Sequence, residues 1–232
     1  LFRLTGDARW HTLFLTTTAF KEERMYLYEW RHHSQADAAF VYLRTDRPGV
    51  DAETRRKCLA AILRTADLCA GLSAKSGFGY TRDTPWQPFM NLMGAPRGAV
   101  NILRAHALTG KAEYLAAAVL ACQSGAGANP SNLCYTTGVG RRSPEHPLVV
   151  DQRVTAQPPP PGITVYGPVD VTKARDNFAV KLIAPHTSPP PWEWPVTESW
   201  FDVYMHPIVC EYTVHESLGP NAYVWGYLAA RE

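Results

Sequence analysis

Two glutamates near the end of the chain, Glu211 and Glu216, have the surroundings of a carboxyl group that could exchange a proton with a bound molecule. Glu211 directly follows an apolar stretch, residues 207–210. A carboxyl group partly buried beside such a stretch keeps its proton more readily than one in water, as a general acid must. Glu216 is the alternative acid, although it precedes an expected helix, where an acidic side chain also complements the helix dipole.

The segment ahead of these glutamates carries groups that suit a sugar polymer. Pyranose rings stack on aromatic faces, and sugar hydroxyls need hydrogen-bond donors and acceptors such as carboxylates, Arg and His. Hydrolysis of a glycosidic bond needs a protonated carboxylic acid and a second carboxylate that activates water or attacks the sugar. The residues expected to contact such a substrate are Tyr135, His146, Asp151, Arg153, Trp86 and Asp202.

Each of these side chains also fits a structural role. The loop tryptophans, such as Trp200, could form a core that covers the helices. His146 could cap a turn, and Asp151 could pair with Arg153. The residue types alone leave both interpretations open.

Helical patterns are expected to position these groups. The clearest spans residues 51–73, where Asp51 is the N-cap and small or apolar residues recur every three to four positions. Further helices are expected at 35–45, 95–108 and 111–123, with a closing helix at 217–230 whose N-cap is Ser217. The pattern Leu-Thr-Gly-x-Ala-x-aromatic occurs at 4–10 and again at 108–114, which indicates recurring helical hairpins or a common turn repeated by chance.

A long loop region separates the hairpins from the closing helix. Of the 19 prolines, 14 lie between Pro130 and Pro207, and runs such as Pro158–Pro161 exclude a helix interior. The region also contains many aromatic residues, which argues against a disordered linker. Loops carried on a helical scaffold are where a binding cleft is commonly built.

Composition excludes several classes of function. The 232 residues carry a net charge of only +2, which gives no case for nucleic acid as the partner. No apolar run approaches the roughly 20 residues of a membrane span. The five cysteines form no Cys-x-x-Cys pair, and three of them lie in helical patterns as expected for core thiols. Neither a metal nor a cofactor is therefore expected.

The ordered motifs resemble those of the C-terminal half of the family-nine glycoside hydrolases, the cellulase and endoglucanase family. The matching pieces are the hairpin at 108–115, the Gly-x-Asn-Pro stretch with Tyr-Thr-Thr-Gly-Val-Gly at 127–140, Pro-Glu-His-Pro at 144–147, Pro-Gly-Ile-Thr-Val-Tyr-Gly-Pro at 161–168, and the closing motif from Asp202 to Glu211. The resemblance implies an all-α fold, part of an (α/α)6 toroid with a long proline-rich loop region, and cleavage of β-1,4-glucans with inversion. It implies that Glu211 is the general acid and that an aspartate activates water.

The resemblance organises residues 1–232 as the C-terminal part of a catalytic domain, with helical hairpins at 1–124, an active-site loop region at 125–216 and the closing helix at 217–230. Three departures stand out. The family's Asp-Ala-Gly-Asp motif is absent, its His-His-Arg is replaced by Leu148-Val149-Val150, and Cys210 stands where the family has Asn. The last departure keeps Glu216 as a rival acid.

The expected partner is a β-linked polysaccharide or oligosaccharide, in a secreted or periplasmic setting, and neither nucleic acid nor membrane. A partner segment that completes the helical ring is also expected, because about half of the toroid's helices are present. The alternatives are a non-catalytic carbohydrate-binding protein and a half-domain that needs a partner to complete its active site.

Overall fold

The computed structural model describes residues 1–21, 35–81, 97–172, 174–204 and 207–231. Within these residues the chain is helical, and the sole β-type pairing is an isolated bridge between Thr136 and Thr164. The helices are α1 (Phe2–Thr5), α2 (Ala8–Thr17), α3 (Ala36–Leu43), α4 (Ala52–Lys75), α5 (Arg97–Thr109), α6 (Ala112–Gly125), α7 (Val150–Thr155), α8 (Phe178–Ile183), α9 (Pro207–Cys210), the π-helical turn η4 (Val214–Leu218) and α10 (Gly219–Ala229). Three short 3-10 turns, η1 (Ala184–His186), η2 (Pro191–Glu193) and η3 (Val196–Glu198), lie between α8 and α9.

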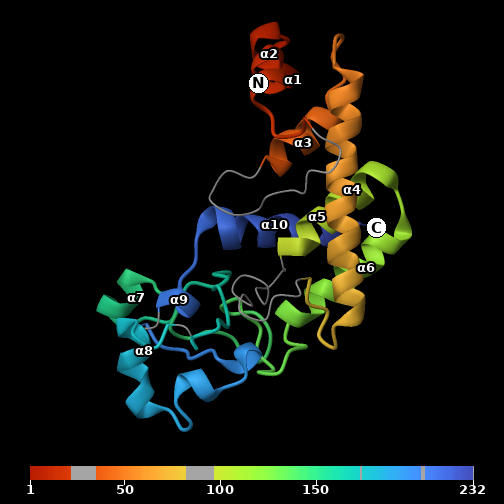
Figure 1. Ribbon diagram of the computed structural model, residues 1–232. Helices are drawn as coiled ribbons and strands as arrows, with labels where there is room; N and C mark the ends of the chain where they lie inside the picture. The colour runs from red at the N-terminus through yellow and green to blue at the C-terminus, as the bar shows by residue number, and fades with distance from the viewer. Residues whose placement is uncertain (22–34, 82–96, 173, 205–206, 232) are drawn as a thin grey trace.

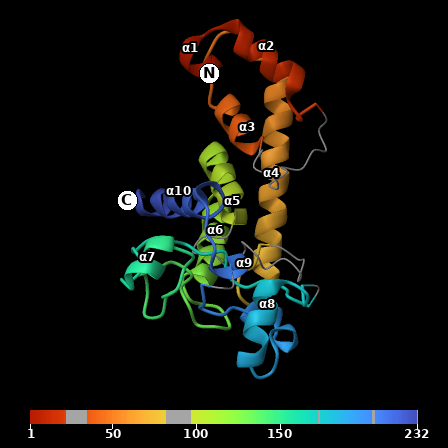
Figure 2. The same cartoon turned by 90° about the vertical axis from the view of Figure 1, so that its left-hand side faces the viewer.

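The helix α4 forms the long axis of the molecule, with α5 and α6 packed beside it (Figures 1 and 2). The side chain of Asp51 accepts a hydrogen bond from the backbone N–H of Thr54 at 2.7 Å, which confirms Asp51 as the N-cap. The interaction with the Thr54 hydroxyl, and then this backbone hydrogen bond, hold the pKa of Asp51 below its usual value. The buried face of α4 includes Cys58, Ile62 and Ala66, as the helical spacing predicted.

The main core lies between α3, α4, α5, α6 and α10. Its fully buried members include Ile62, Ile102 and Leu103, and α10 contributes Val224. Removal of this apolar surface from water is the main stabilising contribution to such a helical layer. All five cysteines are free and buried, so the expected core thiols are confirmed.

The repeated Leu-Thr-Gly pattern forms the same turn twice. Gly6 follows α1 with φ 75°, and Gly110 follows α5 with φ 70°. Glycine adopts this left-handed conformation without the steric cost that a Cβ atom imposes. Each copy therefore ends one helix and starts the next within two residues.

The loop region lies at the end of the molecule opposite to α1 and α2 (Figures 1 and 2). A second, smaller core of Leu133, Tyr135 and Val165, with Tyr80 and Trp200 packed against it, lies within this region. None of the described helices combines the length and apolar character that crossing a membrane requires.

The start of the closing helix differs from the sequence prediction. The helical turn η4 begins at Val214, and the side chain of Thr213, not of Ser217, accepts a hydrogen bond from the N–H of Glu216 at 3.2 Å. Ser217 is buried and its hydroxyl donates to the Thr213 carbonyl at 2.8 Å. The prediction of Ser217 as N-cap was wrong because Thr213 offers the same type of cap one turn earlier.

Candidate functional site

Backbone hydrogen bonds join three extended loop segments, and Glu211 lies where they meet. Val165 N–H donates to the Tyr135 carbonyl at 3.0 Å, and Tyr166 N–H donates to the Glu211 carbonyl at 2.9 Å. On the other side, Leu148 N–H donates to the Cys210 carbonyl at 2.9 Å. The backbone at Glu211 is thus fixed between the segment that contains Tyr166 and the segment that follows His146.

Glu211 itself is half-buried and immediately follows α9. Its neighbour Cys210 is fully buried, and the thiol donates to the Phe201 carbonyl at 3.1 Å. Burial raises the pKa of the Cys210 thiol to about 12, so this side chain stays neutral and acts as a packing group. Glu211 therefore lies on a backbone held by hydrogen bonds, and part of its surface remains exposed.

The rival carboxylate, Glu216, is already engaged by other side chains. The Tyr166 hydroxyl donates to Glu216 Oε2 at 2.6 Å, and the Thr213 hydroxyl lies 3.4 Å from the same oxygen. The side chain of Glu216 is 16% exposed. Burial raises the pKa of the Tyr166 phenol, and the hydrogen bond to Glu216 raises it further, with a smaller contribution from the nearby Glu211 charge.

Asp202 holds the turn that carries His146. Its two carboxylate oxygens accept hydrogen bonds from the backbone N–H groups of Glu145, at 2.7 Å, and His146, at 2.8 Å. The buried side chain of Gln152 donates to the carbonyl of Glu145 at 2.6 Å from the opposite side. The turn of His146 is therefore fixed by contacts from two distant segments.

An aromatic ring joins three of the predicted substrate-binding segments. The His146 ring stands edge-on to Tyr204, with ring centroids 5.0 Å apart. The Arg153 guanidinium carbon lies 5.7 Å from the centroid of the same ring. His146, Arg153 and Asp202 thus form one polar and aromatic cluster around Tyr204, which offers donors, an acceptor and a flat face.

Tyr135 does not belong to this cluster. Its side chain is fully buried in the small loop core, where the ring stands edge-on to Trp200 at 5.7 Å between centroids. The expectation that Tyr135 contacts a substrate is corrected, because a side chain with no exposed surface packs rather than binds. An aromatic residue in a loop suits both roles, and only the tertiary contacts distinguish them.

The remaining predicted residues are placed as follows. Asp151 is exposed in the first turn of α7. Trp86 lies outside the described residues. The expected pairing of Asp151 with Arg153 gives way to the contact between Arg153 and Tyr204. The described part of the chain contains no group of three or more His, Cys, Asp or Glu side chains that could hold a metal ion.

Tyr166 and Thr213 are the contacts of the site that sequence reasoning did not single out. The pattern Thr213-x-x-Glu216 is that of a capping box, which could have located the cap. No local pattern could have paired Tyr166 with Glu216, because 50 positions separate them.

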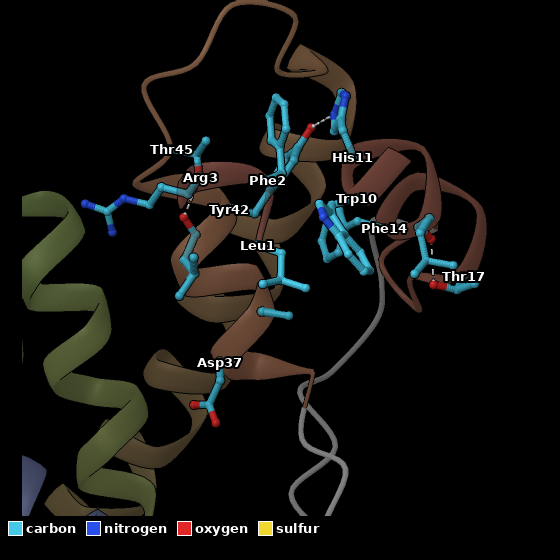
Figure 3. Close-up of a pocket in the computed structure, with 13 residues that line it drawn as sticks. Leu1, Phe2, Arg3, Trp10, His11, Phe14, Thr17, Asp37, Tyr42 and Thr45 are labelled. Carbon is cyan, nitrogen blue, oxygen red and sulfur yellow. Dashed lines mark hydrogen bonds between the residues drawn. The ribbon is translucent and has the colours of Figure 1, made fainter. Parts of the chain in front are cut away.

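Two cavities lie away from Glu211. One, of about 380 Å³, is lined by residues that include Asn132, Cys134 and Arg142. The other, of about 530 Å³, lies between α1, α2 and α3, and aromatic rings including those of Phe2, Trp10 and Tyr42 line it (Figure 3). Neither has Glu211 among its lining residues in the described part of the chain.

Several solved structures that share this fold are endoglucanases. A family-nine endoglucanase matches with a TM-score of 0.81 at 20% identity, covering 100% of this chain and 41% of its own. A thermostable endoglucanase from Alicyclobacillus acidocaldarius matches with a TM-score of 0.74 at 22% identity, covering 100% of this chain and 41% of its own. A metagenome-derived family-nine endoglucanase matches with a TM-score of 0.76 at 22% identity, covering 100% of this chain and 39% of its own. No family model and no curated protein matches the sequence.

The resemblance to family-nine glycoside hydrolases is confirmed as a likeness of fold. The chain is all-α and forms part of an (α/α)6 toroid. It spans about two fifths of the length of these structures.

Proposed function

We propose that this chain supplies the general-acid side of a glycoside hydrolase active site. The substrate is a β-linked polysaccharide or oligosaccharide, and cleavage proceeds with inversion. The observation that supports the proposal best is the position of Glu211. The motif resemblance assigns the acid to this residue, and its backbone is fixed where the loop segments meet, within a fold shared with endoglucanases.

The reaction is a single displacement. Glu211 transfers its proton to the glycosidic oxygen as the bond to the anomeric carbon breaks, and water attacks that carbon from the opposite face. The attacking water gives its proton to a second carboxylate. Because the Asp-Ala-Gly-Asp motif is absent from these 232 residues, we propose that this base lies outside the present sequence.

The cluster around Tyr204 is the proposed sugar-binding surface. His146 and Arg153 supply donors, and the aromatic ring supplies a face for a pyranose. Asp202 is assigned to the support of this surface, because its carboxylate oxygens already accept backbone hydrogen bonds. A polymeric substrate is consistent with a secreted or periplasmic setting.

A further segment is proposed to complete the ring and to cover the cavity at α1–α3 (Figure 3). No residue of α2 is buried, although the helix carries Trp10, Leu13 and Phe14 on its surface towards the cavity. Leu13 is 50% exposed and Val41, across the cavity, is 44% exposed. A contiguous apolar patch of this kind is typical of an interaction surface.

The test is hydrolysis of a β-1,4-glucan by the protein that includes the base-bearing segment. Glu211→Gln should lower kcat by about 10²–10⁴-fold, which is the usual contribution of a general acid. The anomeric form of the first product, followed by NMR, should be inverted. Near-normal turnover by the variant would refute the assignment of Glu211. Binding of oligosaccharide without product would instead favour a non-catalytic carbohydrate-binding protein.

A further inference from the structure

Tyr166 contacts Glu211 and the segment that follows it. Its backbone N–H donates to the Glu211 carbonyl at 2.9 Å. Its hydroxyl reaches past Glu211 to the start of η4, where it lies 2.6 Å from Glu216 Oε2 and 3.1 Å from the Thr213 hydroxyl. One residue that is only 4% exposed thus holds the segment from 211 to 216 at two points.

The direction of these hydrogen bonds sets the role of Glu216. The phenol has a single proton, and its shorter contact, at 2.6 Å, is with the Glu216 carboxylate. The Thr213 hydroxyl donates to the same carboxylate oxygen at 3.4 Å. These two hydroxyls occupy one oxygen of a carboxyl group whose side chain is only 16% exposed. A general acid must reach the leaving oxygen of a bound substrate, so these contacts oppose that role for Glu216.

The cap of η4 explains why Glu216 is free to bind Tyr166. In a capping box, the glutamate side chain reaches back to the N–H of the N-cap residue. Here the Ser217 hydroxyl takes that position and accepts from Thr213 N–H at 3.0 Å. The Glu216 carboxylate therefore points to Tyr166 instead of closing the cap.

We infer that Tyr166 is a positioning residue for the general acid Glu211, and that Glu216 is the anchor of Tyr166 rather than the acid. The inference rests on the proposed function. Loss of the hydrogen bond between Tyr166 and Glu216 leaves the Glu211 side chain chemically intact but loosens the segment that orients it.

The test compares two substrates in the active protein. One is a β-1,4-linked oligosaccharide, whose leaving oxygen must be protonated. The other is an aryl β-glycoside with a dinitrophenolate leaving group, which departs without an acid. A misoriented general acid slows hydrolysis of only the first substrate, whereas a general structural defect slows hydrolysis of both.

Tyr166→Phe removes the hydroxyl and retains the ring and the backbone hydrogen bond. We expect kcat on the oligosaccharide to fall about tenfold, with KM unchanged and activity on the aryl glycoside within about twofold. The matched control is Tyr114→Phe, because the buried Tyr114 hydroxyl also donates to a carboxylate, Asp67, at 2.6 Å, but in α6. The control should leave the ratio of the two activities unchanged.

Glu216→Gln provides the second comparison, since the amide keeps an acceptor for Tyr166 but cannot act as an acid. It should retain far more oligosaccharide hydrolysis than Glu211→Gln. Equal losses on both substrates in Tyr166→Phe would overturn the inference, and so would a Glu216→Gln variant that hydrolyses only the aryl glycoside. If Glu211→Gln hydrolyses the oligosaccharide at the normal rate, the proposed function itself fails.

Discussion

Replacement of Asp202 tests whether the turn of His146 is fixed as the structure indicates. Asp202→Ala removes two hydrogen bonds from backbone N–H groups to a carboxylate, at 2.7 and 2.8 Å. Bonds to a charged acceptor contribute about 1.5–3 kcal/mol each. The Asp202 side chain is 26% exposed, and water can reach the freed N–H groups, so the sum is reduced by about half. The expected loss in the free energy of unfolding is about 1.5–3 kcal/mol.

The measurement is urea unfolding of the 232-residue chain, together with amide hydrogen exchange. Exchange of the Glu145 and His146 amides should accelerate in Asp202→Ala. Asp202→Asn should cost about half as much, because its amide offers one acceptor in place of two. The control is Asp176→Ala, whose side chain is fully exposed and pairs with Lys181, and which should cause no measurable change. A loss below about 0.5 kcal/mol in Asp202→Ala, with unchanged exchange, would refute the reasoning.

Three further predictions concern the scaffold. Gly79→Ala should lower the free energy of unfolding in urea by about 2–4 kcal/mol, because φ is +70° and the new Cβ would lie 2.6 Å from the Leu120 carbonyl oxygen. The control Gly49→Ala, with φ +83° and open space around the new Cβ, should cost about 1 kcal/mol. Equal costs for the two variants would contradict the predicted clash. Burial, and then the Arg231 charge, hold the pKa of His106 below its ordinary 6.5. The unfolded chain therefore binds the proton more readily, and the free energy of unfolding should fall as pH drops through and below 6.5. His106→Gln should flatten this pH dependence, and an unchanged slope in the variant would contradict the prediction. A thiol reagent should react slowly with the native chain and with all five cysteines in denaturant, and rapid reaction of any native thiol would show that the cysteine burial is wrong.

The helices of the scaffold could be predicted because their signals are local. Apolar spacing located α4, and Asp51 marked its start. The Gly6 and Gly110 turns were visible as a repeated pattern, since a left-handed residue between two helices favours glycine. Such signals need only neighbouring residues, so one sequence suffices.

The loop region could be predicted only in outline. Prolines and aromatic residues indicated an ordered loop, but an aromatic side chain does not reveal whether it packs or binds. Tyr135 is buried, while Tyr204 forms the centre of the polar cluster. The assignment depends on contacts between residues 50 or more positions apart, such as Asp202 with His146, and no short-range pattern encodes these.

The choice between the two glutamates likewise depends on a distant partner. From the sequence, Glu216 was a rival because Cys210 stands where the resembling family has Asn ahead of its acid. Its contact with Tyr166 supports an anchoring role, and that contact arises only when the segment at 163–167 pairs with the segment at 209–211.

The closing helix connects the stability of the scaffold to the position of Glu211. Val224 of α10 is buried in the main core, and Asn221 of the same helix donates to the Thr164 hydroxyl at 2.8 Å. That hydroxyl in turn lies 2.8 Å from the hydroxyl of Thr136, so α10 is joined to two of the extended loop segments. Because η4 leads directly from the Glu211 segment into α10, the proposed acid Glu211 is attached to the core through both its loop contacts and the closing helix. A catalytic group needs to be held within about 0.5 Å of its productive position, and loops alone rarely achieve this. The attachment to α10 therefore explains how an acid on a proline-rich loop could be held precisely enough to act.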